Sequence, residues 1–248
     1  MAFRFASIEK LPEPPSAHMT KGSMVHRVLE LLYMQPAAER TRQAAGPAFA
    51  QAVAEYKLDP EFIMLGLDEA QTQAFRDDCW SLTQAYFAME DPATVREIGL
   101  ELRLEAQVGD LTLRGIIDRL ELDANGELVV VDYKTGRRRL TDEDARTSLP
   151  LALYAAAVWR MFRRRCVRVE LHHVPTGTVA AYEHSDDSLV RKVREAESIA
   201  ADLRRADLAM YGAKRSGSRY AVFAAEQEEA PARRLALLGD LAHRVQHG

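Results

Sequence analysis

The sequence predicts an α/β fold, with a mixed central β-sheet flanked by helices and a helical region towards the N-terminus. Two β-rich apolar segments, 111–122 and 127–131, flank a short turn that ends in Asn125-Gly126, and Asn-Gly in such a place is a strong hairpin signal. The run Leu-Val-Val-Val at 128–131 lacks polar alternation, which indicates a strand covered on both faces. A chain of 248 residues is long enough to bury the core of one α/β domain.

The part of the chain before the hairpin is predicted to be mostly helical. Residues 1–20 contain Leu-Pro-Glu-Pro-Pro and are predicted to form an irregular arm. A helix follows, with Ser23 as its N-cap. Its apolar residues recur at helical spacing: Met24, Val25, Val28, Leu29 and Leu32. Residues 38–56 and 67–89 also have helical periodicity, and their aromatic residues are expected in the core: Phe75, Trp80, Tyr86 and Phe87.

The remaining elements alternate between strands and helices. Residues 95–106 have strand character, and a helix is expected to begin at Ser148, because serine is a good N-cap and proline is tolerated in a first turn. Two strands, 167–174 and 178–183, precede an amphipathic helix at 186–207 that Ser185 or Asp186 caps. Residues 211–217 are predicted as a turn and 231–247 as a further helix.

The central hairpin carries three charged residues that a β-sheet would not otherwise favour. Asp118 lies near the middle of the first strand, where aspartate is disfavoured. Folding the hairpin brings Asp118 towards Asp132, and like charges held close together in a partly dry site need a counter-ion. Lys134 leaves the second strand on the same face as Asp132, because strand side chains repeat every two residues. A divalent metal bound through oxygen could also supply the positive charge.

Composition narrows the functional classes. The chain is 47% hydrophobic and 28% charged, as in globular proteins, and its formal net charge is −4, so any nucleic-acid-binding surface must be local. Cys79 and Cys166 match no zinc-binding spacing and are expected to be thiols. No secretory segment, membrane-length apolar run or P-loop is present, so we expect a cytoplasmic protein without a membrane partner.

Two motifs in and after the hairpin resemble a known family. Gly115 to Arg119 reads G-x-x-D-R and Val131 to Gly136 reads V-D-Y-K-T-G. This pair resembles the core of the PD-(D/E)XK nuclease superfamily, and more closely its RecB-type nuclease domain. The resemblance implies a restriction-endonuclease-like core over residues 21–210 with a helical insertion at about 37–91. Two segments lie outside this core: the arm at 1–20 and a C-terminal helical extension at 211–248.

The resemblance implies roles for individual residues. In the family the two acids, here Asp118 and Asp132, bind Mg²⁺, and the lysine, here Lys134, assists the attacking water. The backbone carbonyl of the residue matching Tyr133 often completes the metal shell. The segment around His26 resembles the G-x-x-x-H-x-x-L-E helix of RecB-type domains, whose histidine is commonly a ligand; a histidine at the rim of a helix is the alternative.

Supporting and substrate-binding residues follow from the same resemblance. Glu101 is expected to support the metal ligands as a hydrogen-bonding partner or to be an outer metal ligand. Glu105 is a competing candidate for this role. The alternative is that Glu101 is an ordinary exposed carboxylate of a strand. Tyr154 matches the tyrosine of the family's Q-x-x-x-Y motif, whereas Pro150 replaces the glutamine. Three arginines are expected to contact DNA phosphates, although those of the loop suit a solvated loop equally well: Arg119, Arg137 and Arg138.

The sequence therefore predicts a nuclease that depends on Mg²⁺ or Mn²⁺. We expect an exodeoxyribonuclease of DNA repair or recombination, with DNA and a helicase or repair complex as partners. Many RecB-type nucleases hold an iron–sulfur cluster with four cysteines, but this chain has two, so no such cluster is expected. The alternatives are a DNA-binding scaffold that cuts weakly or not at all, for which Pro150 argues, and a nuclease that acts on RNA.

Overall fold

The computed structural model describes residues 16–216, whose strands form one mixed five-stranded sheet. The strand order follows the chain, and each pair of neighbours is antiparallel except β3 and β4, which are parallel. The strands are β1 (Arg96–Val108), β2 (Leu111–Leu122), β3 (Leu128–Lys134), β4 (Cys166–His173) and β5 (Thr178–Tyr182). The fold is therefore α/β, and it is consistent with a restriction-endonuclease-like core.

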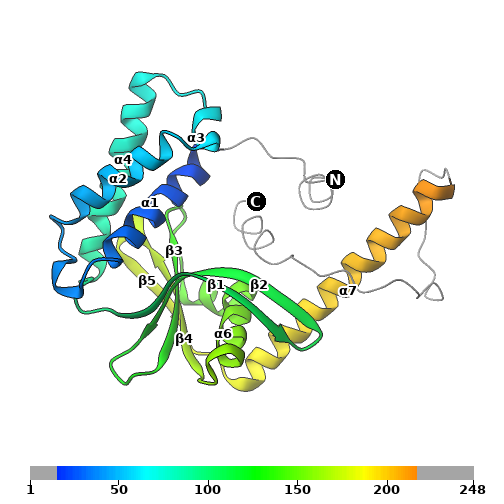
Figure 1. The fold of residues 1–248 in the computed structure, drawn as a ribbon. Coiled ribbons are helices and arrows are strands. Elements are labelled where there is room, and N and C mark those ends of the chain that lie inside the picture. Colours follow the sequence, from blue (N-terminus) through cyan, green and yellow to red (C-terminus); the bar gives the residue numbers. More distant parts are fainter. Residues whose placement is uncertain (1–15, 217–248) are drawn as a thin grey trace.

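Helices cover both faces of this sheet (Figure 1). The helices before the sheet are α1 (Ala17–Tyr33), α2 (Ala45–Tyr56), α3 (Pro60–Met64) and α4 (Glu69–Met89), with a 3₁₀ turn η2 (Ala37–Glu39). Those after β3 are α5 (Asp142–Thr147), α6 (Leu149–Phe162) and α7 (Asp186–Ser216), with a 3₁₀ turn η3 (Val174–Thr176). Helix α6 provides the crossover that parallel strands require, and α7 projects beyond the sheet (Figure 1).

The predicted hairpin joins β2 and β3. Gly126 adopts a φ of 78°, which explains the glycine, whereas Asn125 keeps an ordinary backbone conformation. The carboxylate of Asp123 accepts hydrogen bonds from the amides of Asn125 and Glu127, both at 2.9 Å, and so closes the turn. Residues 128–131 are buried, as their unbroken apolar run predicted.

Alternation along β3 sorts its side chains between two hydrophobic layers. Val129, Val131 and Tyr133 pack with α1 and α4, and Leu128 and Val130 pack with α6. Asp132 therefore follows Val130 on the α6 face and Tyr133 follows Val131 on the other. At the end of β3, the acid Asp132 and the aromatic Tyr133 therefore lie on opposite faces of the sheet.

Several predicted boundaries differ in the structure. Helix α1 begins at Ala17, with Ser16 as its N-cap through a 3.2 Å bond from the amide of Met19, so the N-cap assigned to Ser23 was wrong. The residues that follow Ser16 are exposed as far as Met19, so the buried apolar periodicity begins only in the second turn. Helix α7 continues to Ser216 through the predicted turn at 211–217. The predicted helix at 231–247 lies outside the described residues.

Other predictions about the helices are confirmed. Ser148 caps α6 with its hydroxyl, and Ser185 accepts a bond from the amide of Ser188 at the start of α7. Of the four aromatic residues expected in the core, Phe75 and Tyr86 are buried, whereas Trp80 and Phe87 are only half-buried. Within residues 16–216, none of the helices combines the length and the apolar character that crossing a bilayer requires.

Candidate active site

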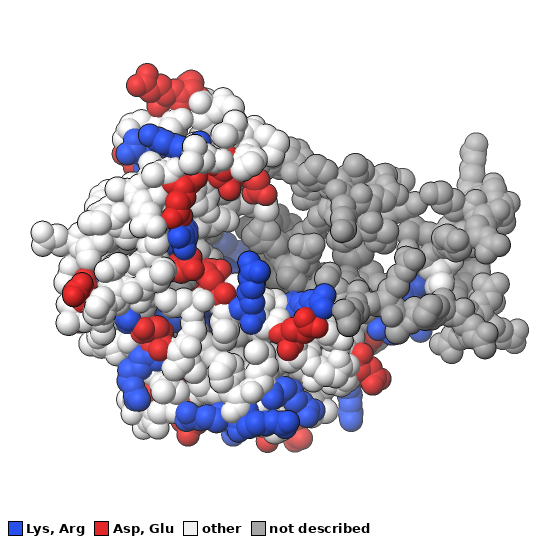
Figure 2. Space-filling view, in the orientation of Figure 1, with Lys and Arg blue, Asp and Glu red and all other residues white. Residues whose placement is uncertain are grey.

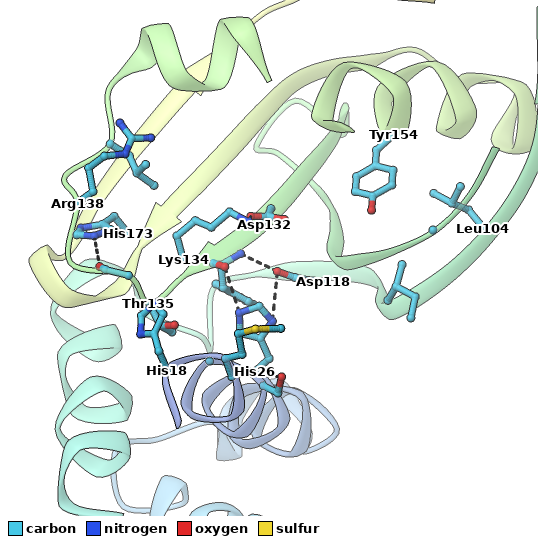
Figure 3. A pocket seen from close by; sticks show the side chains of 18 of the residues that line it. His18, His26, Leu104, Asp118, Asp132, Lys134, Thr135, Arg138, Tyr154 and His173 are labelled. Carbon is cyan, nitrogen blue, oxygen red and sulfur yellow. Dashed lines mark hydrogen bonds and ion pairs between the residues drawn. The ribbon is translucent and has the colours of Figure 1, made fainter. Parts of the chain in front are cut away.

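A cleft of about 960 Å³ opens where α1, β1, β2, the end of β3 and α6 meet. Figure 3 shows His26 from α1, Asp118 from β2, Asp132 and Lys134 from β3, and Tyr154 from α6 around it. The fold therefore brings to one place the residues that four separate sequence segments singled out. These residues come from four elements, so their proximity is a property of the tertiary structure.

His26 reaches the cleft because α1 packs closely against the loop after β3. A Cβ added at Gly22, one turn before His26, would lie 3.0 Å from the hydroxyl oxygen of Thr135. Nε2 of His26 lies 3.1 Å from the carbonyl oxygen of Tyr133, and Nδ1 lies 3.5 Å from a carboxylate oxygen of Asp118. Burial lowers the pKa of His26, but Asp118 outweighs it and raises the pKa to about 9.

The two hairpin acids line the same cleft with different partners. The β2–β3 register pairs Arg119 with Val131, so one further step places Asp118 opposite Asp132. Oδ2 of Asp118 accepts a 2.7 Å hydrogen bond from the amide of Tyr133. Asp132 lies 2.7 Å from the ammonium of Lys134, as their two-residue spacing predicted.

Glu101 joins this group through an unusual backbone conformation. The register of β1 and β2 places Glu101 across from Asp118, between the pairs Leu100–Arg119 and Leu102–Ile117. Its φ is 42°, in the left-handed region that glutamate rarely adopts, at a cost of roughly 1–3 kcal/mol. Burial, with an added effect of Asp118, raises the pKa of Glu101 to about 7. Backbone strain at a cleft residue is typical of functional positions.

Three donor atoms lie close enough together to hold one metal ion. His26, Glu101 and Asp118 each offer one ligand atom, and these atoms all lie within 4.8 Å of one another in the part of the chain that the structure describes. The predicted set of His26, Asp118, Asp132 and the Tyr133 carbonyl overlaps with this group. Glu101 belongs to the group in place of Asp132, whose carboxylate pairs with Lys134.

Comparison with known proteins places this site in a family. The model of the PD-(D/E)XK nuclease superfamily matches residues 1–235. The chain belongs to the PD-(D/E)XK nuclease superfamily. A search of curated proteins finds no match to the chain. Membership supports nuclease activity, and nucleases of this superfamily generally use divalent metal ions.

Tyr154 explains the glycine of the superfamily-like G-x-x-D-R segment. A Cβ added at Gly115 would lie 2.6 Å from Cε1 of Tyr154, so only glycine lets the ring approach β2. Burial, with added effects of Asp132 and Asp118, raises the pKa of Tyr154 to about 12, so its hydroxyl stays protonated. Pro150 lies in the first turn of α6, where its missing N–H is not needed.

The prediction that Arg119 contacts DNA is wrong. Its side chain is fully buried on the face of β2 opposite Asp118. The guanidinium donates to the hydroxyls of Tyr33, Tyr86 and Tyr133, and it forms 2.7 Å ion pairs with two acids, Glu90 and Glu121. We name these six residues the Arg119 network. The motif alone could not show this, because adjacent strand residues point to opposite faces.

Arg137 and Arg138 are exposed and line the cleft, where they remain candidates for phosphate contact. Arg138 also pairs with Asp144 at 2.9 Å. Glu105, the competing candidate to Glu101, is exposed and pairs with Arg114 at 2.9 Å. Its position on β1 therefore keeps it outside the donor group.

Sequence reasoning missed His18 because it placed this residue in the N-terminal arm, and it assigned no role to Lys21. His18, Gly22 and His26 repeat every four residues and lie on one face of α1. His18 lines the cleft beside Gly136, and Lys21 lines a neighbouring cavity. The sequence signal for His18 is its helical spacing from His26. This spacing has a meaning only when the helix is known to start at Ala17.

Proposed function

We propose that this protein is a metal-dependent deoxyribonuclease of the RecB type. The observation that carries the proposal is the donor group of His26, Glu101 and Asp118 in a cleft that also holds the Asp132–Lys134 pair. A metal-dependent hydrolase for phosphodiesters needs ligands for a divalent cation, a positioned cation for developing charge and room for a polyanion. The cleft supplies a donor group that could hold the ion, the ammonium of Lys134 and a volume of about 960 Å³.

The donor set fits a hard divalent cation. It holds two carboxylates and one imidazole, and carboxylate ligands suit Mg²⁺ or Mn²⁺, whereas zinc favours more nitrogen or sulfur. His26, Glu101 and Asp118 would hold the ion, with Asp132 and the carbonyl of Tyr133 beside them. A bound cation lowers the pKa of water and offsets the charge of the phosphate.

Lys134 is proposed to act as a cation. Burial lowers its pKa, but Asp132 and Asp118 outweigh burial and raise the pKa above the ordinary value. An ammonium in this state orients water and stabilises negative charge on the phosphate, rather than removing a proton itself. Tyr154, protonated and close to both hairpin acids, is proposed to position substrate, and Arg137 and Arg138 to contact phosphates.

The finer assignments rest on the likeness of both motifs to RecB-type domains. We propose exonuclease action on DNA during repair or recombination, use of Mg²⁺, a cytoplasmic location, and association with a helicase or repair complex. Cys79 and Cys166, both buried thiols, offer no set of four ligands for an iron–sulfur cluster, so none is proposed.

A cleavage assay tests this function. Purified protein is incubated with Mg²⁺ and single-stranded DNA, duplex DNA or RNA of equal length. We expect DNA cleavage that chelation abolishes, loss of cleavage with retained DNA binding in Lys134→Ala, and normal cleavage in Lys57→Ala, which changes an exposed lysine outside the cleft. Wild-type turnover in Lys134→Ala would reject the assignment. Binding without cleavage in every case would favour the scaffold alternative, and cleavage of RNA alone would favour a ribonuclease.

A further inference from the structure

A second cavity continues the active-site cleft along the outer turns of α1. Its volume is about 520 Å³, and it lies between α1 and α4. His18 and Arg137 line both this cavity and the cleft, so the two spaces share a wall (Figure 3 shows His18 beside Thr135). Neither a motif nor the donor group accounts for this cavity.

The lining of this cavity combines cations with an apolar floor. Lys21 and Arg137 carry the positive charge, and Leu67, Ala74 and Phe75 provide the apolar surface. Asp78 lies 3.3 Å from the ammonium of Lys21. The Lys21 side chain is 19% exposed and that of Asp78 is 68% exposed, so the lysine is held inside the cavity while the acid faces solvent.

The positive charge of this cavity is local, from Lys21 and Arg137. The chain has a formal net charge of −4, and Figure 2 shows both signs interspersed over the visible face. A general electrostatic attraction therefore does not explain substrate binding. Cations placed beside the cleft would contact a polyanion that already occupies the metal site.

The distance from the donor group suits a nucleic-acid strand. Five residues separate Lys21 from His26, which is about 7.5 Å along α1, or roughly two stacked nucleotides at 3.4 Å each. The volume lies in the range of a pocket for one small molecule of roughly 300–1,000 Å³, so it admits a nucleotide unit and not a duplex.

We propose that this second cavity binds the backbone of single-stranded DNA a few nucleotides away from the scissile phosphate, with Lys21 as its phosphate contact. The proposal rests on the proposed nuclease function and adds the substrate's path and strandedness. Asp78 restrains Lys21 and repels the same phosphate. The two residues therefore have opposite effects on binding.

The test compares Lys21→Gln with Asp78→Asn on long and short substrates. On a twelve-nucleotide strand, Lys21→Gln should raise KM about fivefold and reduce the slope of log affinity against log salt by about 0.7, the loss of one phosphate contact on a single strand. Asp78→Asn should lower KM for the same strand. On a two-nucleotide substrate, which does not reach the cavity, both variants should change KM by less than twofold.

Matched controls separate this effect from general charge. Arg139→Gln changes an exposed arginine of the same loop as Arg137 that lines neither space, and Lys57→Gln changes the exposed C-cap lysine of α2, which also lines neither space. Both controls should behave as the wild type on both substrates.

Changes of KM in opposite directions for Lys21→Gln and Asp78→Asn distinguish a role in DNA binding from a role in stabilising the fold. If the Lys21–Asp78 pair only stabilised the fold, both substitutions would shift KM in the same direction and at both lengths, and this result would overturn the proposal. Equal KM in all variants would also overturn it. If the wild-type protein cleaves no DNA at all with Mg²⁺, the proposed function fails first, and that outcome is recognised without any variant.

Discussion

The protonation states of His26 and Glu101 depend on acids that surround them. His26 has a pKa of about 9 because Asp118 outweighs the effect of burial, and Glu101 has a pKa of about 7 because burial and Asp118 disfavour its charge. At neutral pH the imidazolium therefore supplies the positive charge that the acids need. A metal ion would take over this role, since its ligands must be deprotonated.

This exchange predicts that metal binding depends on pH. Between about pH 7 and 8.5, binding of Mn²⁺ must release the proton of His26, so affinity should rise about tenfold per pH unit. Below about pH 7 Glu101 is also protonated, and the slope should approach two protons. Calorimetric titrations in buffers of different ionisation enthalpy measure the protons released, and His26→Gln should remove the dependence above pH 7. An affinity independent of pH from 6 to 8.5 would contradict the assignment.

Contact between Gly115 and Tyr154 gives a second prediction at this scale. Gly115→Ala forces the Tyr154 ring away from β2, and overpacking of this kind costs about 1–3 kcal/mol of stability. Urea unfolding measures the loss. In a Tyr154→Ala background the same substitution should cost much less, because the atoms that clash are gone. Equal costs in both backgrounds would show that the contact does not restrict this position.

At the scale of elements, two dipeptides organise the site. Asp118-Arg119 on β2 and Asp132-Tyr133 on β3 each place an acid in the cleft and an anchor beneath the sheet. The hydroxyl of Tyr133 accepts a 2.8 Å bond from Arg119, while its backbone contacts both Asp118 and His26. The Arg119 network therefore fixes the strand that carries the donors.

We predict that this network is a major source of stability. Arg119→Met removes the guanidinium from Glu90 and Glu121 in a largely buried setting and leaves Glu90 with only His172 at 3.6 Å, which costs about 3–5 kcal/mol. Tyr133→Phe removes one hydrogen bond and should cost about 1 kcal/mol. Urea midpoints measure both, with Arg146→Met, whose ion pair with Glu143 is exposed, as a control that leaves the midpoint nearly unchanged. A similar midpoint for Arg119→Met and Arg146→Met would show that the network is not needed.

The elements that were predictable from sequence are those with a local physical signal. The hairpin was marked by Asn-Gly, β3 by its unbroken apolar run, and α6 by Ser148 and the proline of its first turn. The first turn of α1 was missed because Ala17, His18 and Met19 are exposed and add nothing to the buried apolar pattern. The burial of Arg119 and the left-handed conformation of Glu101 were not predictable, since both depend on partners far away in the chain.

At the scale of the whole molecule, binding relies on local charge placed around a cleft. The chain is acidic overall, and the cations that line the cleft come from β1, β2, β3 and the loop that follows β3. Helices α1 and α4 on one face and α6 on the other hold the end of β3 between them. The sequence could indicate the family and the acids, but only the packed sheet shows that Glu101 joins them.

The central claim is that Asp118 holds a divalent ion on which cleavage depends, and calorimetric titration of Asp118→Asn with Mn²⁺ tests it most directly. Outer partners of metal ligands already change affinity by about 10–100-fold, so loss of a direct ligand should weaken Mn²⁺ binding by at least about 100-fold. Asp77→Asn, an exposed acid on α4, is the matched control and should bind as the wild type does. Unchanged Mn²⁺ affinity in correctly folded Asp118→Asn would contradict the claim.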